Sequence, residues 1–251
     1  MRYTPKFFRD SLPEWKKKEC SLLERIFYRP VSSYFSSIAA SLKISANTVS
    51  YFTLFLALLA CVFYLFRSPA LSILGAVLIN LWRVLDSVDG SIARCIKKQP
   101  FGEYADSLSS YFLVGLICTS MSMSVFFSGG ILFEAGNPWI IFMGALASSS
   151  DSLMRLGYQK YRYVAKELQE KGVIPPENLE RRGPNSVGGI TIRIEKELGI
   201  SGILPLLILI ATIFNTLDLI IVYCFIYYGS ACAVSTLKFV RKTIRYSRVP
   251  H

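Results

Sequence analysis

Long apolar segments occupy most of this chain between residues 47 and 237. A helix that crosses about 30 Å of hydrocarbon needs about 20 mostly apolar residues. Overall, 18% of the residues are charged, fewer than the roughly 25% of an ordinary soluble domain. We therefore predict an all-α integral membrane protein with six transmembrane helices, behind an amphipathic interfacial helix. The six spans are expected at residues 47–66, 70–89, 106–127, 138–158, 203–214 and 217–237.

The lysines and arginines between these segments indicate the orientation. They concentrate before the first span, between the second and third, after the fourth, and in the tail, whereas only Arg67 lies on the other side. Because positive charges favour the cytoplasmic side, we expect both termini in the cytoplasm and the protein in the plasma (inner) membrane. The net charge of +11 is explained by this topology and by attraction to anionic head groups. We therefore do not expect nucleic acid as a partner.

An amphipathic segment precedes the first span. Its pattern is typical of a helix that lies in the membrane interface, with a cytoplasmic helix packed on the bundle as the alternative. Pro30 is expected to interrupt it. We divide the chain into an interfacial segment (1–45), a six-helix transmembrane domain (46–237) and a basic cytoplasmic tail (238–251). The apolar stripe of the interfacial segment consists of Leu22, Leu23, Ile26 and Phe27.

The residue inventory excludes several kinds of catalysis. The only histidine is His251, the last residue, which removes Ser-His-Asp and Cys-His catalysis as well as histidine-ligated zinc or haem. The six cysteines show no metal-binding spacing and mostly lie in apolar runs, where cysteine is usually a buried hydrophobe. Chemistry on this chain must therefore rest on carboxylates, hydroxyls and bound metal.

Three aspartates are the most informative residues. Asp86 and Asp89 lie near the end of the second span, and Asp106 lies near the start of the third. An antiparallel hairpin folded about residue 98 brings Asp89 level with Asp106, and Asp86 level with Ser110. Carboxylates at membrane depth are costly and are usually paired or functional. We therefore expect these three to form one site at the cytoplasmic end of the hairpin.

The neighbouring residues indicate which ligand such a site takes. An oxygen-only ligand set suits Mg²⁺ or Mn²⁺, and pairing of the carboxylates with Arg83 and Arg94 is the structural alternative. The small residues Gly90 and Ala93 would let a ligand approach the backbone closely. Arg94 can bind a phosphate through two hydrogen bonds. Together these features predict a site for a diphosphate and divalent metal.

Residues 86–94 read Asp-x-x-Asp-Gly-x-x-Ala-Arg, and after seven residues Gly102-x-x-x-Asp106-x-x-x-Ser110 follows. This pattern resembles the signature of the CDP-alcohol phosphotransferase (CDP-alcohol phosphatidyltransferase) family. Asn47-Thr48 is similar to the family's Pro-Asn pair, with Ala46 in place of the proline. The resemblance implies two divalent ions, with Asp86, Asp89 and Asp106 as metal ligands. It also implies a CDP-binding set of Asn47, Gly90, Ala93, Arg94 and Gly102.

The same resemblance implies a reaction. An acceptor hydroxyl attacks the phosphorus distal to cytidine in a CDP-linked donor, a phospho-alcohol group is transferred, and CMP leaves. The pathway is expected to be lipid or lipid-linked glycan synthesis, with a lipid or a phosphorylated alcohol as acceptor. A homodimer is also implied by the family alone.

Ser110 departs from the family pattern, because the family has a fourth aspartate here that is a metal ligand and the general base. A serine hydroxyl is an uncharged, weaker ligand and no base near neutral pH. Three explanations stay open. The base comes from elsewhere, or the acceptor needs none because its nucleophile is already anionic. The third is a catalytically silent homologue that binds nucleotide-linked lipid or a partner protein.

Asp151 in the fourth span is the candidate for a relocated base, so Ser110 and Asp151 form the candidate catalytic set. Arg155 follows Asp151 at i+4, and an internal ion pair that only fixes helix packing is the alternative. Arg155 and Arg193 are candidate acceptor-binding residues, since arginines at cytoplasmic helix ends can hold a phosphorylated alcohol. Simple topology charges are the alternative interpretation of both.

Overall fold

The computed structural model describes residues 3–175 and 197–247. Within these ranges the chain forms helices and no strand, which confirms the all-α prediction. In chain order the elements are α1 (Pro5–Asp10), α2 (Glu14–Glu19), the π-helical turn η1 (Glu24–Tyr28), α3 (Arg29–Ser41), α4 (Ala46–Phe63), α5 (Pro69–Cys95), α6 (Gly102–Ser128), α7 (Pro138–Glu170), α9 (Leu204–Ile213) and α10 (Leu217–Ser247).

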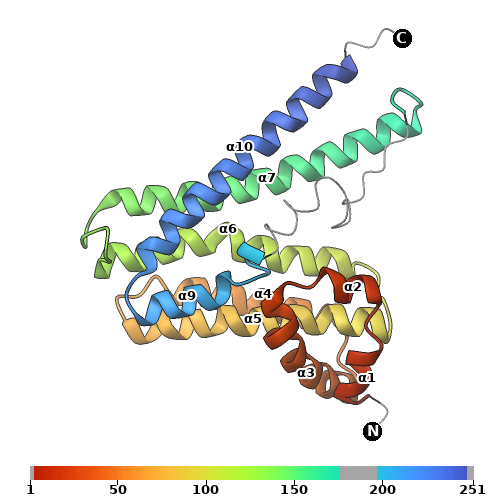
Figure 1. Cartoon of the computed structure of the whole chain (residues 1–251), viewed down its shortest axis with the longest axis horizontal. Helices are drawn as coiled ribbons and strands as arrows, with labels where there is room; N and C mark the ends of the chain where they lie inside the picture. The colour runs from red at the N-terminus through yellow and green to blue at the C-terminus, as the bar shows by residue number, and fades with distance from the viewer. Residues whose placement is uncertain (1–2, 176–196, 248–251) are drawn as a thin grey trace.

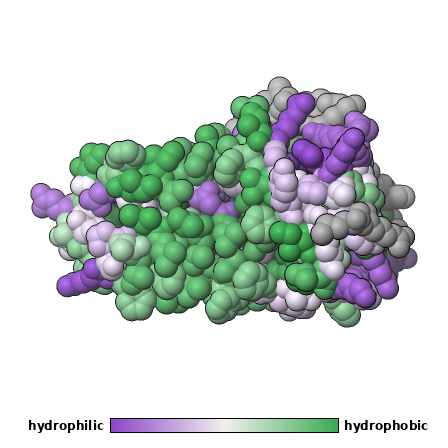
Figure 2. Space-filling view, turned by 90° about the horizontal axis from the view of Figure 1, so that it is seen from below, coloured by the Kyte–Doolittle hydropathy of each residue, from purple (hydrophilic) through white to green (hydrophobic). Residues whose placement is uncertain are grey.

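Four of the described helices, α4, α5, α6 and α10, are long and apolar enough to cross a membrane. The longer helix α7 carries many charged side chains in its second half, and α9 has ten residues, about 15 Å at 1.5 Å per residue. Figure 2 shows hydrophobic residues over most of one face, with hydrophilic residues gathered at the end where α1–α3 lie. The protein is therefore a multi-pass membrane protein, with four such helices where the sequence predicted six spans.

The long helices pack in a chain of neighbours. α4 packs against both α5 and α6, α7 packs against α6 and α10, and α9 lies on α5. α7 and α10 run together past the rest of the bundle, and α1–α3 gather beside one end of α5 (Figure 1). α10 continues through residues that were predicted to form a separate tail. Phe239 of this extension stacks on Tyr161 of α7, with ring centroids 4.9 Å apart.

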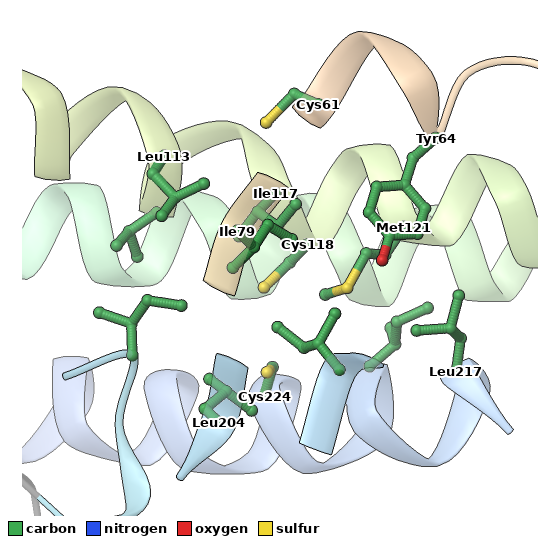
Figure 3. Packing of buried hydrophobic residues seen from close by; sticks show 14 of the residues in the cluster. Cys61, Tyr64, Ile79, Leu113, Ile117, Cys118, Met121, Leu204, Leu217 and Cys224 are labelled. Carbon is green, nitrogen blue, oxygen red and sulfur yellow. The ribbon is translucent and has the colours of Figure 1, made fainter. Parts of the chain in front are cut away.

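One cluster of buried apolar side chains joins α4, α5, α6, α7, α9 and α10. Figure 3 shows part of it, where side chains from α4, α5 and α6 meet those of α9 and α10. Cys61, Cys118 and Cys224 are buried in this cluster as free thiols. They occupy the positions of ordinary core hydrophobes, as predicted for cysteines within apolar runs.

Prolines mark the starts of helices in this chain. Helices α1, α3, α5, α7 and α9 each have a proline in the first turn. A first-turn proline lacks only an N–H that has no partner within the helix. The turn η1 therefore runs directly into α3 through Pro30, and the prediction that Pro30 interrupts the segment was wrong. The apolar stripe stays exposed along this continuous element at Leu22, Ile26, Phe27, Tyr34 and Ile38.

The packing of α6 against α7 depends on Gly144. A Cβ atom at this position would lie 2.4 Å from Ser122 Oγ and 2.6 Å from the Cys118 carbonyl oxygen. We expect Gly144→Ala to lower the free energy of unfolding by about 1–3 kcal/mol, because the backbone contact must open. Thermal unfolding in detergent measures this effect.

The control for that measurement is Gly157→Ala on the same helix. Apart from the helix's own backbone, no atom of the described residues lies within 4 Å of an added Cβ there, so the substitution should stabilise the helix by about 0.5–1 kcal/mol. Equal melting temperatures for the two variants would contradict the packing argument.

Candidate active site

A cavity of about 630 Å³ lies where α5 ends and α6 begins. Its volume falls within the range of small-molecule sites, about 300–1,000 Å³. Helix α5 has 27 residues and is roughly 40 Å long. This is longer than the hydrocarbon core of about 30 Å, so α5 has turns to spare at its end, beside the cavity. Side chains from α2, η1, α3, α5, α6 and α7 line the cavity, together with residues 21, 200 and 201.

The three motif aspartates line this one cavity, together with Ser110. Asp89 is 4% exposed, and its Oδ2 accepts a hydrogen bond of 2.7 Å from Ser50 Oγ on α4. The Oδ2 of Asp86 accepts one of 2.9 Å from Arg83 Nη1. Asp89 and Asp106 form no ion pair with any residue that the structure describes. Pairing with arginine thus accounts for one carboxylate of the three.

The guanidinium of Arg94 does not lie against a carboxylate of the described residues, as it would in an ion pair. Its guanidinium folds back over Gly90, where an added Cβ would lie 2.6 Å from Arg94 Nη2. Both residues line the cavity, and within the described part of the chain Arg94 has no carboxylate partner. Gly90 is therefore needed for the position of Arg94, which leaves this guanidinium available for an anion.

The remaining members of the predicted CDP-binding set lie outside the cavity lining. Asn47 Nδ2 donates to the Pro100 carbonyl oxygen at 2.9 Å. Its buried Oδ1 has no hydrogen-bond donor in the described residues and lies 3.3 Å from where a Cβ on Gly102 would be. These two residues thus meet at the hairpin turn. Ala93 packs instead against a small apolar cluster formed by Ala39, Ala46, Val49, Val88 and Ile92.

Asp151 and Arg155 form the internal ion pair that was the alternative interpretation. Asp151 is 1% exposed and does not belong to the cavity lining, which argues against it as a general base there. Its Oδ2 accepts a hydrogen bond from Arg155 Nε. Arg155 itself lines the cavity, and its guanidinium lies 5.6 Å from the centroid of the Tyr111 ring. Arg193 lies outside the described residues.

The interfacial segment supplies cavity residues that sequence reasoning missed, namely Lys16, Glu24 and Arg29. The only signal for them was an acidic residue within the apolar stripe at position 24. Burial lowers the pKa of the Lys16 amine. Cationic lining residues are Lys16, Arg29, Arg83, Arg94, Arg155 and Arg162, and acidic ones are Glu24, Asp86, Asp89, Glu103 and Asp106.

The carboxylate donors have the chemistry that Mg²⁺ and Mn²⁺ prefer. Two of the three motif aspartates face the cavity without an ion pair in the described residues, and a cation would balance their charge. Across residues 3–175 and 197–247, no three or more His, Cys, Asp or Glu side chains lie close enough together to hold a metal ion as they stand. The donor set therefore fits a divalent cation in its chemistry, while Arg83 competes for Asp86.

Most residues that line the cavity lie in a part of the chain that matches a known protein family. The family model described as CDP-alcohol phosphatidyltransferase matches residues 43–172, more than half of the 251 residues. The match includes the motif aspartates, Arg94, Ser110 and the Asp151–Arg155 pair, and it excludes residues 1–42 of the interfacial segment, α9 and α10. A comparison with curated proteins found no match.

Proposed function

Because the chain belongs to the CDP-alcohol phosphatidyltransferase family, a transferase family of lipid synthesis, we propose that it transfers a phospho-alcohol group from a CDP-linked donor to an acceptor at the cytoplasmic membrane face. The observation that carries this proposal is one cavity lined by Asp86, Asp89, Asp106 and Arg94. The cavity lies at the end of two membrane-crossing helices, so either the donor or the acceptor is a lipid.

In the proposed transfer, an acceptor oxygen that is already anionic, and so has no proton to lose, forms a bond to the phosphorus distal to cytidine. The bond between that phosphorus and the bridging oxygen breaks, and its electron pair leaves with CMP. The guanidinium of Arg94, which has no carboxylate partner among the described residues, would bind diphosphate oxygens through two hydrogen bonds. Asp86, Asp89 and Asp106 would hold Mg²⁺ or Mn²⁺, two ions by family analogy. When bound, such ions stabilise charge on attacking and leaving oxygens.

The acceptor is proposed to be a phosphorylated alcohol. Arg155 and Arg162 on α7 line the cavity, and the ion pair with Asp151 holds the Arg155 guanidinium in place. Guanidinium groups recognise phosphate through paired hydrogen bonds. An acceptor that brings its own anionic oxygen also explains how transfer proceeds with Ser110 in place of a carboxylate base. Arg193 remains a proposed acceptor contact by its place in the basic segment.

The test is CMP release by the purified protein in lipid nanodiscs, with CDP donors paired with neutral or phosphorylated acceptors, with and without Mg²⁺. Release that needs both metal and acceptor supports the transferase. The alternative is a silent homologue, which the loss of the fourth carboxylate at Ser110 favours. Binding of a CDP donor without CMP release, for every acceptor in the panel, would support that alternative.

The proposed topology has six spans, with α7 and α9 added to the four long apolar helices, both termini cytoplasmic, and the chain in the plasma membrane as a homodimer. It is tested with Glu134→Cys and Lys171→Cys in a background without native cysteines. Glu134 lies between α6 and α7, and Lys171 directly follows α7; both are exposed. An impermeant thiol reagent outside intact cells should label only position 134, and labelling at 171 would refute the orientation.

A further inference from the structure

Arg83 connects three parts of the chain at the edge of the cavity. Its side chain is 4% exposed, and its Nε and Nη2 donate to the Ser201 carbonyl oxygen at 3.1 and 3.0 Å. Nη1 donates to Asp86 Oδ2 and to Ser87 Oγ, both at 2.9 Å. Nη2 also lies 3.2 Å from Glu24 Oε2. A single guanidinium charge is thus shared between a motif aspartate and a glutamate of the interfacial segment.

Glu24 is a buried anion on η1. It is 7% exposed, and its Oε1 lies 2.8 Å from Arg29 Nη2, in addition to the contact of Oε2 with Arg83. Burial by itself raises the pKa of the Glu24 carboxyl, but the charges of Arg83 and Arg29 outweigh burial, so the pKa lies below its usual value. Glu24 is therefore ionised at neutral pH, and its negative charge offsets part of the positive charge of Arg83.

The same arginine anchors the interfacial segment to the bundle. Tyr28 is completely buried, its ring centroid lies 5.4 Å from the Arg83 guanidinium, and its hydroxyl donates to Asn80 Oδ1 at 2.9 Å. On the other side of the segment, Leu22 and Ile26 are exposed. Glu24 thus lies between a surface suited to lipid and an aspartate of the candidate site.

We propose that Glu24 is a positioning residue that sets the affinity of the aspartate set for a divalent cation. Because Arg83 faces both Glu24 and Asp86, the charge of Glu24 offsets part of the arginine charge that otherwise competes with a cation for Asp86. Glu24 lies outside the residues matched by the family model, whereas Arg83 and Asp86 lie within them. The inference rests on the proposed metal site.

The test is Mn²⁺ binding to the purified, substrate-free protein in nanodiscs, measured by calorimetry, with thermal unfolding as the check of folding. Glu24→Gln keeps the shape of the side chain and removes its charge. We expect it to weaken Mn²⁺ binding by about 10–100-fold, the usual effect of losing a partner that orients a metal ligand. The matched control is Glu14→Gln, on the exposed Glu14–Lys17 pair of the same segment, which should bind Mn²⁺ like wild type.

A double variant tests whether the effect passes through Arg83. In Glu24→Gln/Arg83→Gln no guanidinium competes for Asp86, so Mn²⁺ binding should recover toward the wild-type value. If Glu24→Gln does not fold, Glu24→Asp should still give a smaller loss in the same direction, since the shorter side chain loosens the contact with Arg83. Wild-type affinity in a folded Glu24 variant, or no recovery in the double variant, would overturn the proposal. Absence of Mn²⁺ binding to wild type would instead overturn the metal site itself, and this inference with it.

Discussion

Asp89→Asn should reduce metal-dependent CMP release by about 1,000-fold or more. A bound metal ion supplies several kcal/mol of charge stabilisation, and each 1.36 kcal/mol corresponds to a tenfold change in rate. Asn has the size of Asp and can still accept the hydrogen bond from Ser50 Oγ, so the fold should survive. The measurement is the initial rate of CMP release against Mg²⁺ concentration, together with the melting temperature.

The control for this experiment is Asp10→Asn, which changes an exposed aspartate at the end of α1. This variant should release CMP at the wild-type rate. If Asp89→Asn keeps its activity and its Mg²⁺ dependence, the motif carboxylates do not hold the metal and the proposed mechanism fails.

Ser110→Asp is expected to harm the reaction by about 100-fold, the cost that a misplacement of about 1 Å can impose on a reacting group. In the structure Ser110 lines the cavity, and its hydroxyl donates to the Ser107 carbonyl oxygen within α6 at 3.0 Å. A fourth carboxylate beside Asp106 would repel an anionic acceptor and change the metal geometry. The assay compares CMP release over the same donors and acceptors.

Two further substitutions at position 110 separate charge from size. Ser110→Asn has the volume of aspartate without its charge and should retain more activity than Ser110→Asp. Ser110→Ala removes a hydroxyl that is already bonded to its own helix, and should stay close to wild type. Activity that appears only in Ser110→Asp would mean that this chain is a silent homologue whose fourth carboxylate was lost.

Several features of the fold follow from local sequence alone. The apolar runs around α4, α5, α6 and α10 were predicted to within a few residues at most of their ends, because hydrophobic length is a local property. Three boundaries differed more. α5 continues to Cys95 where the predicted span ended at residue 89, and α10 continues past residue 237, where Phe239 stacks on the Tyr161 ring of α7. Pro30 lies in the first turn of α3 and does not interrupt the segment, since a first-turn proline loses no hydrogen bond.

The spacing of the motif residues also predicted that they lie together. Asp86, Asp89 and Asp106 flank a short turn, so an antiparallel hairpin brings them to the same end of the bundle, and all three line one cavity. The same spacing did not reveal which small residues face that cavity. Gly90 lies under Arg94, whereas Ala93 packs into an apolar cluster with α3 and α4, and this choice depends on the rotation of α5 against its neighbours.

Which groups partner the charges of the site depends on tertiary packing. Asp151 and Arg155 lie one helical turn apart, yet the aspartate is buried outside the cavity while the arginine lines it. Glu24 reaches Arg83 from a separate helical element, and Arg83 in turn reaches Ser201 near α9. The contacts of Arg83 with Glu24 and Ser201 join segments far apart in the chain, and hydrophobic periodicity does not encode them, because it reports only which side of each helix is buried. Their physical cause is that a buried charge must find a partner wherever packing brings one within reach.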